Sequence, residues 1–551
     1  MSTRNKGNGV QASPKDTTPT QGEPYKSPPY KLVRFFEKSR TQWKVKCRAA
    51  KATIKVMQSR LRFLEESRER WKRRAQALEQ EVVRLAAASR GAARVRQALK
   101  KRLHEPAVPK PSRGAALALV PAHHQYSVGT IGLFLTLVLT VATSLRCASR
   151  VLALWGEMGE QPEAVPAWET GRWWVLRVGY YKLTRPKAHA EDWVWIVDHT
   201  AQLGARKCLV ILGLRLSALP APGQCLRHAD VEPLVLEPVV KSSGEIVYQQ
   251  LEATMKKTGV PREIISDHGG DVKAGVARFC AVHPTTAAIY DIKHKTATVL
   301  EQELEEDPAW REFTQLCQQT KHQVQQTALA FLMPPNQRTK ARWLNVDILV
   351  RWGTKALTFL DTPPPERTPS CDGTRLEEKF GWLPRFRPQV QLWSEFLQVI
   401  ALTEHVVRTQ GLERGTPKQL HQLLAPLVLS PRAARVRAHL LAFVTEEALQ
   451  AYPRERLLGS SEVIESVLGK FKRLEATQSK SGFTGLLLTI GAMVAQTTHE
   501  VIHKALETVP TKRVLEWCQQ TLGASLQAER RKAFAVPSQP EQKCHQEQEA
   551  A

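Results

Sequence analysis

The sequence predicts an α/β protein in which a mixed sheet is preceded by helices and carries a large helical insertion. Two observations predict this class. Between residues 187 and 300 the apolar residues form short runs that are typical of strands, whereas on either side they recur every three or four positions, as along helices. The chain has 551 residues, enough for several domains, and its 42% hydrophobic and 24% charged residues exclude a wholly disordered protein.

Most of the positive charge lies at the beginning of the chain. The formal net charge is +26 and the pI is near 9.8, which indicates a partner rich in phosphate. Residues 1–102 hold 27 Lys and Arg against 8 Asp and Glu, a net charge of +19 that leaves only +7 for the rest of the chain. We therefore expect a basic arm joined to a nearly balanced globular protein.

The basic arm is expected to consist of a tail and a coiled coil. Residues 1–29 are polar, lack the apolar core of a signal peptide and are expected to be disordered. Residues 30–103 are expected to form a basic coiled coil, because seam positions alternate at intervals of three and four from Val33 to Leu85. A single long helix docked on its own protein is the alternative, and its Lys and Arg residues are either simply solvated or contact phosphates.

Residues 104–125 contain four prolines and are expected to be a linker. Residues 126–186 then show three helical patterns, the third of which opens with polar residues and Arg172. This outline is similar to a helix-turn-helix DNA-binding domain, in which Arg172 would contact DNA. A generic three-helix bundle is the alternative.

One uncharged stretch, residues 128–145, reaches the lower limit of length for a membrane span. Its glycines, its threonines and the arginines that follow favour a buried core helix, so we expect no membrane partner. The nine cysteines contain no Cys-x-x-Cys pair, which is typical of reduced thiols. These features predict a cytoplasmic protein, associated with the nucleoid if the source is bacterial.

Residues 187–300 are expected to form a sheet with one crossover helix. Three strands, a helix and a fourth strand parallel to the first make a βαβ unit, and a fifth strand follows. Residues 301–455 are expected to be a helical insertion, residues 456–535 the second part of the domain that contains the sheet, with C-terminal helices, and residues 536–551 a disordered tail. The expected strands cover 194–198, 208–216, 231–240, 261–267 and 287–291, and the helix covers 245–257.

Three acidic residues stand at positions where they could meet. Asp198 is expected to end the first strand and Asp267 the fourth, and the ends of parallel neighbouring strands lie at one edge of a sheet. Glu465 is expected in the first turns of a helix that begins near Ser461, and Lys472 shares its face seven residues later. Taken singly, such residues are often only turn formers or partners of a helix dipole.

Together, these features resemble those of the DDE transposases, whose catalytic domain has the ribonuclease-H-like fold of retroviral integrases. The matching features are the strand order, the acid after the first strand, Asp-His-Gly-Gly after the fourth, and the helix Ile-Glu-x-x-Leu-x-x-x-Lys. The resemblance covers about residues 190–300 and 455–500. The Tyr and Arg that often precede the family's glutamate are out of register, since Tyr452 and Arg456 lie too far upstream and Ser461 takes the Arg position.

The resemblance implies roles for individual residues. Asp198, Asp267 and Glu465 would be catalytic and would bind Mg²⁺ or Mn²⁺, with Glu462 as the alternative to Glu465. Lys472 would contact a DNA phosphate. Carboxylates are suitable ligands for these hard cations, and two ions roughly 4 Å apart can promote an in-line phosphoryl displacement.

The function implied by the resemblance is that of a DNA transposase. Such a protein binds transposon ends and target as double-stranded DNA, cleaves and joins strands with its metal ions, and works as a homodimer or larger synaptic assembly. The chain has no Gly-x-x-x-x-Gly-Lys-Ser/Thr loop, so no nucleotide cofactor is expected. The alternative is a non-catalytic DNA-binding or regulatory protein derived from a transposase.

Most of the other noticeable residues of the expected sheet and insertion are expected to be structural. Cys280 and His283 form a Cys-x-x-His like that found beyond the second aspartate in some of these families, and a packing role is expected for both. His199 and His268 are expected to be structural, and Asp291 could be an auxiliary ligand. Core positions are expected, in preference to stacking on an extruded base, for Trp310, Trp343 and Trp352.

Overall fold

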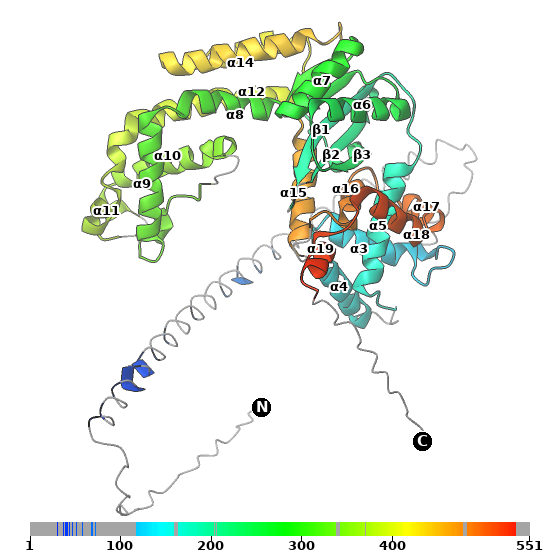
Figure 1. Ribbon diagram of the computed structural model, residues 1–551. Helices are drawn as coiled ribbons and strands as arrows, with labels where there is room; N and C mark the ends of the chain where they lie inside the picture. The colour runs from blue at the N-terminus through cyan, green and yellow to red at the C-terminus, as the bar shows by residue number, and fades with distance from the viewer. Residues whose placement is uncertain are drawn as a thin grey trace, which may run out of the picture. The chain divides into compact units, whose positions relative to one another are not determined.

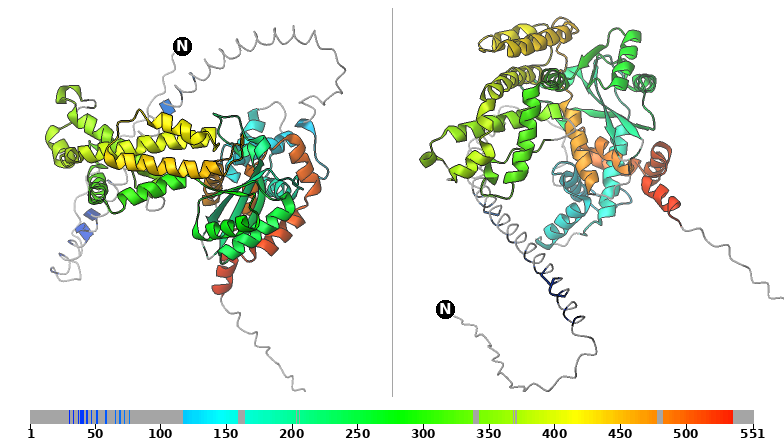
Figure 2. Two further views of the ribbon diagram at one scale, coloured as in Figure 1. Left: turned by 90° about the horizontal axis from the view of Figure 1, so that it is seen from above. Right: turned by 60° about the vertical axis from the view of Figure 1, so that its left-hand side comes forward.

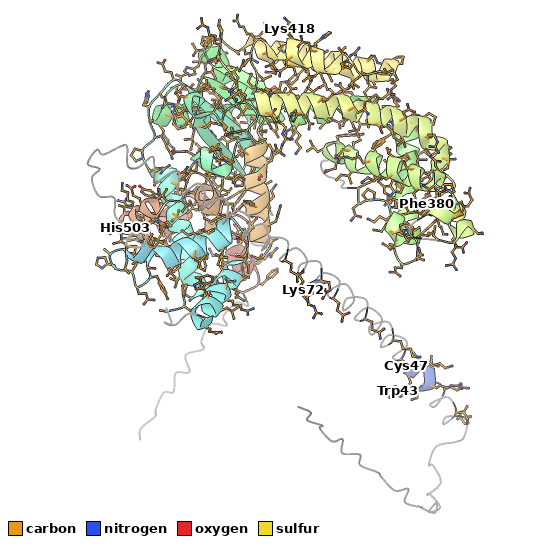
Figure 3. All side chains as sticks on the ribbon, turned by 180° about the vertical axis from the view of Figure 1, so that it is seen from behind. Trp43, Cys47, Lys72, Phe380, Lys418 and His503 are labelled. Atoms are coloured by element: carbon orange, nitrogen blue, oxygen red, sulfur yellow. The ribbon has the colours of Figure 1, made fainter. Side chains whose placement is uncertain are left out.

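The computed structural model describes residues 117–535 apart from 159–163, 203, 205, 338–341, 368, 370 and 478–481, together with isolated residues between 30 and 76 (Figure 1). The chain divides into two compact units, residues 1–110 and 111–551. In the first unit the described residues, such as Trp43, Cys47 and Lys72, are helical (Figure 3). Most of the expected coiled coil and both expected tails lie outside the described residues.

The second unit contains a five-stranded mixed sheet with the strand order β3-β2-β1-β4-β5. β1, β2 and β3 are antiparallel neighbours, whereas β4 is parallel to β1 and β5 is parallel to β4. The five expected strands and the mixed sheet are thus confirmed, and this order is compatible with a ribonuclease-H-like core. The strands are β1 (Trp193–Ala201), β2 (Lys207–Arg215), β3 (Glu232–Val239), β4 (Glu263–Ser266) and β5 (Ala287–Tyr290).

Alternating side chains of β1 place helices on both faces of the sheet. Trp195 and Val197 belong to the core that β1 shares with α6 (Gly244–Thr258) and α7 (Gly270–Val282), which lie together on one face (Figure 1). Val194 and Ile196 belong to the core on the opposite face, with apolar residues of α15 (Glu462–Ala476). The expected crossover helix is α6, which ends where Gly259 adopts a φ of +89°.

The segment between β5 and α15 is helical, as expected for an insertion, although its first helix begins at Ile292 rather than at residue 301. Figure 2 shows the long helices α12 and α14 running side by side. The helices are α8 (Ile292–Leu304), α9 (Pro308–Val324), α10 (Val346–Asp361), α11 (Gly373–Phe380), α12 (Arg387–Gln410), α13 (Thr416–Leu424) and α14 (Pro431–Leu449).

The three tryptophans of this insertion that the sequence analysis singled out occupy different environments. Trp310 is buried, with its ring centroid 4.9 Å from that of Trp393, and its expected core position is confirmed. Trp352 is half-buried against the same core and donates its indole N–H to the carbonyl of Leu332. Trp343 is half-buried, hydrogen-bonds to Glu301 and lines a cavity of about 820 Å³.

Helices from the two ends of the second unit form one bundle. The three helices expected in residues 126–186 are present, but C-terminal helices pack against them. Within α5 only Glu169 and Thr184 are exposed, so α5 is the central helix of this bundle. The helices are α3 (Val128–Leu139), α4 (Leu145–Met158), α5 (Trp168–Thr184), α16 (Leu488–Met493), α17 (His499–Thr508), α18 (Thr511–Trp517) and α19 (Leu526–Ala533).

The uncharged stretch at residues 128–145 is not one continuous helix. Its helix α3 ends at Leu139 and buries Ile131 and Phe134 completely. Ser127 caps the beginning of α3, because its hydroxyl accepts a hydrogen bond from the Thr130 N–H. The expected core helix is therefore confirmed. Within the described residues, no helix has both the length and the apolar character needed to cross a membrane.

Candidate active site

The sheet brings Asp198 and Asp267 to one edge. The parallel pairing of β1 with β4 ends at Val197 and Ser266, and each aspartate is the next residue. The sequence analysis expected Asp198 to end its strand, and this is wrong, because β1 continues to Ala201 along β2. The expectation that both carboxylates emerge side by side still holds, since it depends on the β1–β4 pair alone.

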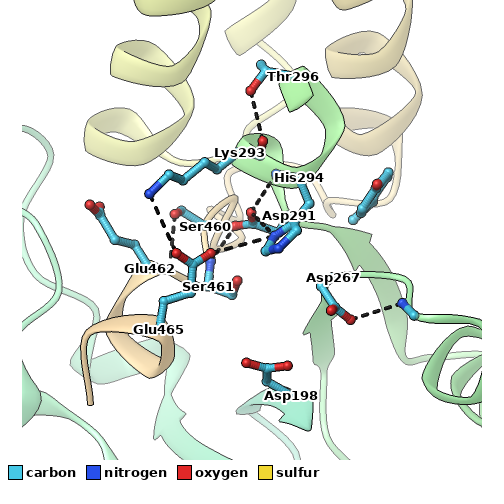
Figure 4. Close-up of polar contacts among 12 residues, drawn as sticks. Asp198, Asp267, Asp291, Lys293, His294, Thr296, Ser460, Ser461, Glu462 and Glu465 are labelled. Atoms are coloured by element: carbon cyan, nitrogen blue, oxygen red, sulfur yellow. Dashed lines mark hydrogen bonds and ion pairs between the residues drawn. The ribbon is translucent and has the colours of Figure 1, made fainter. Parts of the chain in front are cut away.

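Glu465 joins these aspartates from α15, which packs against β1. Figure 4 shows the carboxyl groups of Asp198, Asp267 and Glu465 around one shared space. Burial, followed by the charge of Asp267, raises the pKa of Asp198 to about 7, and the charge of Glu465 adds to the effect. Asp267 and Glu465 are therefore close enough to Asp198 to disfavour a negative charge on it.

Glu465 also meets two basic residues at the beginning of α8. Lys293 Nζ lies 3.5 Å from Glu465 Oε2, and His294 Nδ1 lies 3.6 Å from Glu465 Oε1. The Oε1 atom is buried and accepts no hydrogen bond from the described residues. An oxygen in that state can still accept a donor or bind a cation.

Asp291 fixes the position of His294 and of α15. One carboxylate oxygen accepts from the backbone N–H of Ser461 at 2.7 Å, and the other accepts from His294 N and His294 Nδ1, both at 3.0 Å. Since a carboxylate can only accept, Nδ1 of His294 carries the proton and Nε2 is left for another partner. Burial opposes a charge on His294, but the Asp291 hydrogen bond and charge outweigh it and raise the pKa of His294.

The segment that leads into α15 is attached to β4 and β5. Arg262 pairs with Glu455 at 2.6 Å, and the fully buried Glu263 accepts the backbone N–H of Leu458 at 2.9 Å. The Ile292 N–H donates to the carbonyl of Gly459. These contacts determine where α15 begins and thus where Glu465 lies, although more than 190 residues separate it from β4.

Asp291, His294 and Glu465 form one compact group, in which one ligand atom from each lies within 4.8 Å of the others. Asp198 and Asp267 lie beside this group and not within it. Asp291 already accepts three hydrogen bonds and is completely buried, so it orients His294 instead of offering a free oxygen. The available oxygens are those of Asp198, Asp267 and Glu465.

Two of the residues implied by the resemblance lie at the margin of the site. Glu462 forms an ion pair with Arg408 of α12 and is directed away from Asp198 and Asp267 (Figure 4). Lys472 is exposed on α15, and its contact with DNA stays a prediction. The geometry therefore favours Glu465 over Glu462 as the third acid.

Arg172 lies in the helical bundle, away from the carboxylates. It is half-buried, with its guanidinium 5.5 Å from the ring centre of Trp173, and burial lowers its pKa. A recognition helix needs an exposed face to enter the major groove, and α5 is covered by α16, α17 and α18. DNA binding by Arg172 stays a prediction that this packing does not favour.

Three histidines that the sequence analysis weighed have structural partners. His283 pairs with Glu252 of α6 at 2.9 Å, on the layer formed by α6 and α7. His199 lies 3.6 Å from Asp271. His268 has a φ of +57° and stacks on Tyr290 with centroids 4.2 Å apart.

Sequence reasoning missed Lys293 and His294. A signal was present, because Asp291-Ile-Lys-His294 has the same spacing as Cys280-Ala-Val-His283 and directly follows the fifth strand. The structure places this Asp-x-x-His, and not Cys280 and His283, beside the acids.

No family model matches the chain, and no curated protein matches it either. Among solved structures, the chain is similar to a Drosophila P element transposase in its strand transfer complex. The TM-score is 0.35 and the sequence identity is 9%, over 75% of this chain and 100% of that one.

Proposed function

We propose that the chain is a DNA transposase of the DDE type, which cuts and joins DNA strands with the help of Mg²⁺ or Mn²⁺. One observation carries this proposal. Asp198, Asp267 and Glu465 come from a strand, the end of a strand and a distant helix, yet their carboxyl groups surround one shared space (Figure 4), where the charges of Asp267 and Glu465 add to burial in raising the pKa of Asp198. Keeping like charges together in a partly buried site is unfavourable unless a cation or a proton compensates them.

The donor set fits a hard divalent cation. Asp198, Asp267 and Glu465 offer carboxylate oxygens, and Glu465 Oε1 is buried without a hydrogen bond. When bound, Mg²⁺ or Mn²⁺ would supply Lewis-acid polarisation of the phosphodiester and of the attacking oxygen. His294, oriented by Asp291, and Lys293 hold Glu465 in place at the edge of the sheet.

The protein's remaining residues would bind and position DNA. Hydrolysis at a transposon end and attack by the freed 3′-hydroxyl on target DNA are both in-line displacements at phosphorus, so one site can serve both. The basic residues 1–102 would add affinity that does not depend on DNA sequence. Pairing of two arms through the expected coiled coil, residues 30–103, would join two copies in a synaptic assembly.

Cleavage of DNA that carries the sequences flanking this gene tests the proposal. The full chain is incubated with this DNA and Mg²⁺ or Mn²⁺, and new 3′ ends are mapped. We expect Asp198→Asn, Asp267→Asn and Glu465→Gln each to lower the rate by about 100-fold or more, as for other preorganised charged groups. The matched control is Glu462→Gln, because Glu462 lies on the same helix only three positions from Glu465 but is paired with Arg408. This variant should retain most activity.

Two results would contradict this assignment. Undiminished cleavage by the Asp267→Asn variant would show that this carboxylate group is not needed for catalysis and would contradict the proposed carboxylate site. DNA binding without any metal-dependent cleavage by the unchanged chain would favour the alternative, a non-catalytic regulator derived from a transposase.

A further inference from the structure

A second row of residues on α15 leads away from the carboxylate cluster. Glu462, Ser466 and Lys470 are four residues apart and share a face of the helix. Ser466 and Glu462 border a hollow of about 290 Å³, and Lys470 borders another of about 470 Å³. His228 lines both hollows and hydrogen-bonds to Ser466 at 3.0 Å, so the two adjoin along α15.

The larger of these, which we call the basic hollow, lies between α3, residues 227–229 at the start of a short 3₁₀ helix (His228–Asp230), Lys470 of α15, and residues 492–498. Its charged lining consists of Arg227 and Lys470, and none of the described residues that line it is Asp or Glu. The rest of its polar lining is mainly hydroxyl and amide groups, from Thr136, Thr140, Gln496, Thr497 and Thr498.

The two cations of the basic hollow are available to a ligand. Arg227 is exposed; its Nε and one Nη donate to the two carboxylate oxygens of Asp230 at 3.3 Å, and its remaining N–H groups are left for a ligand. No ion pair of Lys470 occurs among the described residues. Burial and then the nearby charge of Lys470 lower the pKa of His228, so the existing positive charge discourages a further one.

The wall formed by residues 492–498 is held by a buried ammonium. Lys182 of α5 is fully buried, and its Nζ donates to the carbonyls of Ala492, Val494 and Ala495 and to the hydroxyl of Thr497, at 2.7–3.0 Å. Lys182 does not line the hollow. The carbonyl oxygens that would repel an anion are therefore engaged with Lys182.

We propose that the basic hollow binds the phosphate backbone of DNA where the strand leaves the carboxylate cluster. Two cations, several hydroxyl donors and no lining carboxylate match phosphate oxygens, which are the usual targets of such groups. One helix, α15, carries both Glu465 and Lys470, and this continuity favours DNA over an acidic peptide. The identity of the polyanion rests on the proposed function.

The salt dependence of DNA binding tests this proposal. The full chain binds a fluorescein-labelled 30-base-pair duplex of arbitrary sequence without divalent metal, and anisotropy gives Kd between 100 and 400 mM KCl. Each phosphate contact contributes a slope of about −0.9 to log K against log salt. We expect Lys470→Gln and Arg227→Gln each to weaken that slope by about 0.9, the double variant by about twice as much, and Lys470→Arg to restore it.

Lys418→Gln is the matched control, because Lys418 is an exposed lysine on α13 of the insertion (Figure 3). It should leave the affinity and the slope unchanged, and equal melting temperatures would show that all variants fold. An unchanged slope in the double variant overturns the proposal. The hollow would instead be assigned to an acidic peptide if polyglutamate competes with DNA for the unchanged chain but not for the double variant, while DNA binding by the double variant is unchanged.

The same samples separate this proposal from the proposed function. Asp198→Asn should lose cleavage and keep the full salt slope, whereas the double variant should lose slope and keep its metal site. If the double variant loses the expected salt slope but the unchanged chain does not cleave DNA, the hollow binds DNA and the proposed enzymatic function is wrong. If the unchanged chain cleaves DNA but the double variant keeps the full salt slope, the proposed function stands and the proposal for the hollow is wrong.

Discussion

Two buried carboxyl groups, Glu447 and Glu263, lie outside the candidate site. Glu447 is 7% exposed and accepts from Gln450 at 2.8 Å, and burial raises its pKa to about 8 against the effect of the Tyr290 backbone N–H. Burial raises the pKa of Glu263 well above its ordinary value as well, and the charges of Glu455 and Glu447 contribute. The folded protein is therefore more stable when each of these carboxyl groups is protonated than when it is charged.

This linkage predicts how Glu447→Gln changes stability with pH. Because the pKa is higher in the folded protein than the ordinary 4.5, the carboxyl group's contribution is fully present below pH 4.5 and is lost as the pH rises to about 8. Glutamine keeps a neutral hydrogen-bonding side chain. We expect the variant to be more stable than the unchanged chain at pH 8, by less than the about 5 kcal/mol that the whole shift represents, and similar to it at pH 4.5.

Chemical denaturation at both pH values measures this effect. Glu446→Gln is the comparison, because Glu446 is exposed on the same helix and its charge helps to raise the pKa of Glu447, so it should give a pH-dependent gain in the same direction but smaller. Equal stability gains at pH 4.5 and pH 8 would show that the charge of Glu447 is not responsible.

Asp291 offers a second test at the scale of one residue. Asp291→Asn keeps a good N-cap for α8 but removes the charge that orients His294 and weakens the bond to Ser461 N. We expect a loss of about 1–3 kcal/mol in the free energy of unfolding and a lower cleavage rate, as Glu465 loses its support. Urea unfolding and the cleavage assay measure the two effects.

Asp307→Asn serves as the control for this variant. Asp307 is likewise an N-cap aspartate, on α9, and its backbone contacts would survive the change. It should leave the cleavage rate unchanged. If both variants cleave equally well, the Asp291–His294 pair does not position the site.

The residue scale also shows what the sequence could reveal of the site. The meeting of Asp198 and Asp267 at one edge of the sheet could be predicted from the two strands that carry them, whereas Glu465 could be expected there only because of the family resemblance. The catalytic roles of all three stay predictions. His294 was missed because its role depends on Asp291 holding the ring, and that contact is set by the packing of α8 against the start of α15.

At the scale of elements, the crossing of α5 and α16 depends on glycine. A Cβ added to Gly179 would lie 2.0 Å from the carbonyl oxygen of Leu488, and one added to Gly491 would lie 2.9 Å from the oxygen of Gly179. Both obstacles are backbone atoms, which cannot rotate away. Close contact of the two helices therefore requires glycine at both positions.

Gly179→Ala should force the helices apart and lower stability by about 1–3 kcal/mol, the usual cost of overpacking. Gly469→Ala is a matched control, because Gly469 also lies within a helix and its added Cβ would meet open space. That change should raise stability by up to about 1 kcal/mol through better helix propensity. Thermal unfolding of both variants measures the contrast, and a stable Gly179→Ala protein would disprove the close crossing.

Most elements of the second unit could be predicted from local patterns. Every expected strand was found, with ends shifted by a few residues, since apolar runs and turn residues are read locally. The ends of β1 were less predictable, because β2 extends it beyond the last residue paired with β4. The burial of α5 could not be predicted at all, since the helices that cover it come from the far end of the chain.

At the scale of the whole molecule, the bundle joins segments that are far apart in sequence. Lys182 of α5 bonds to residues 492–497, more than 300 positions away, and Arg177 donates to the carbonyl of Val509. The sequence analysis assigned residues 126–186 and 456–535 to different domains. In the structure, the helices of the first range bury their apolar faces against α16, α17 and α18.

This arrangement predicts that residues 111–189 do not fold alone. Without the C-terminal helices, the apolar face of α5 and the ammonium of Lys182 would have no partners, and a short three-helix segment has little other apolar surface to bury. We expect this fragment to show weak helical circular dichroism and no cooperative melting.

Adding a fragment of residues 482–535 should restore both the helical signal and cooperative melting, because it supplies the missing face. The same addition with Lys182→Met in the first fragment should restore less, since three buried carbonyl groups and the hydroxyl of Thr497 would lose their donor. Cooperative melting of residues 111–189 by themselves would show instead that the N-terminal helices are an independent domain and that the C-terminal helices only dock on it.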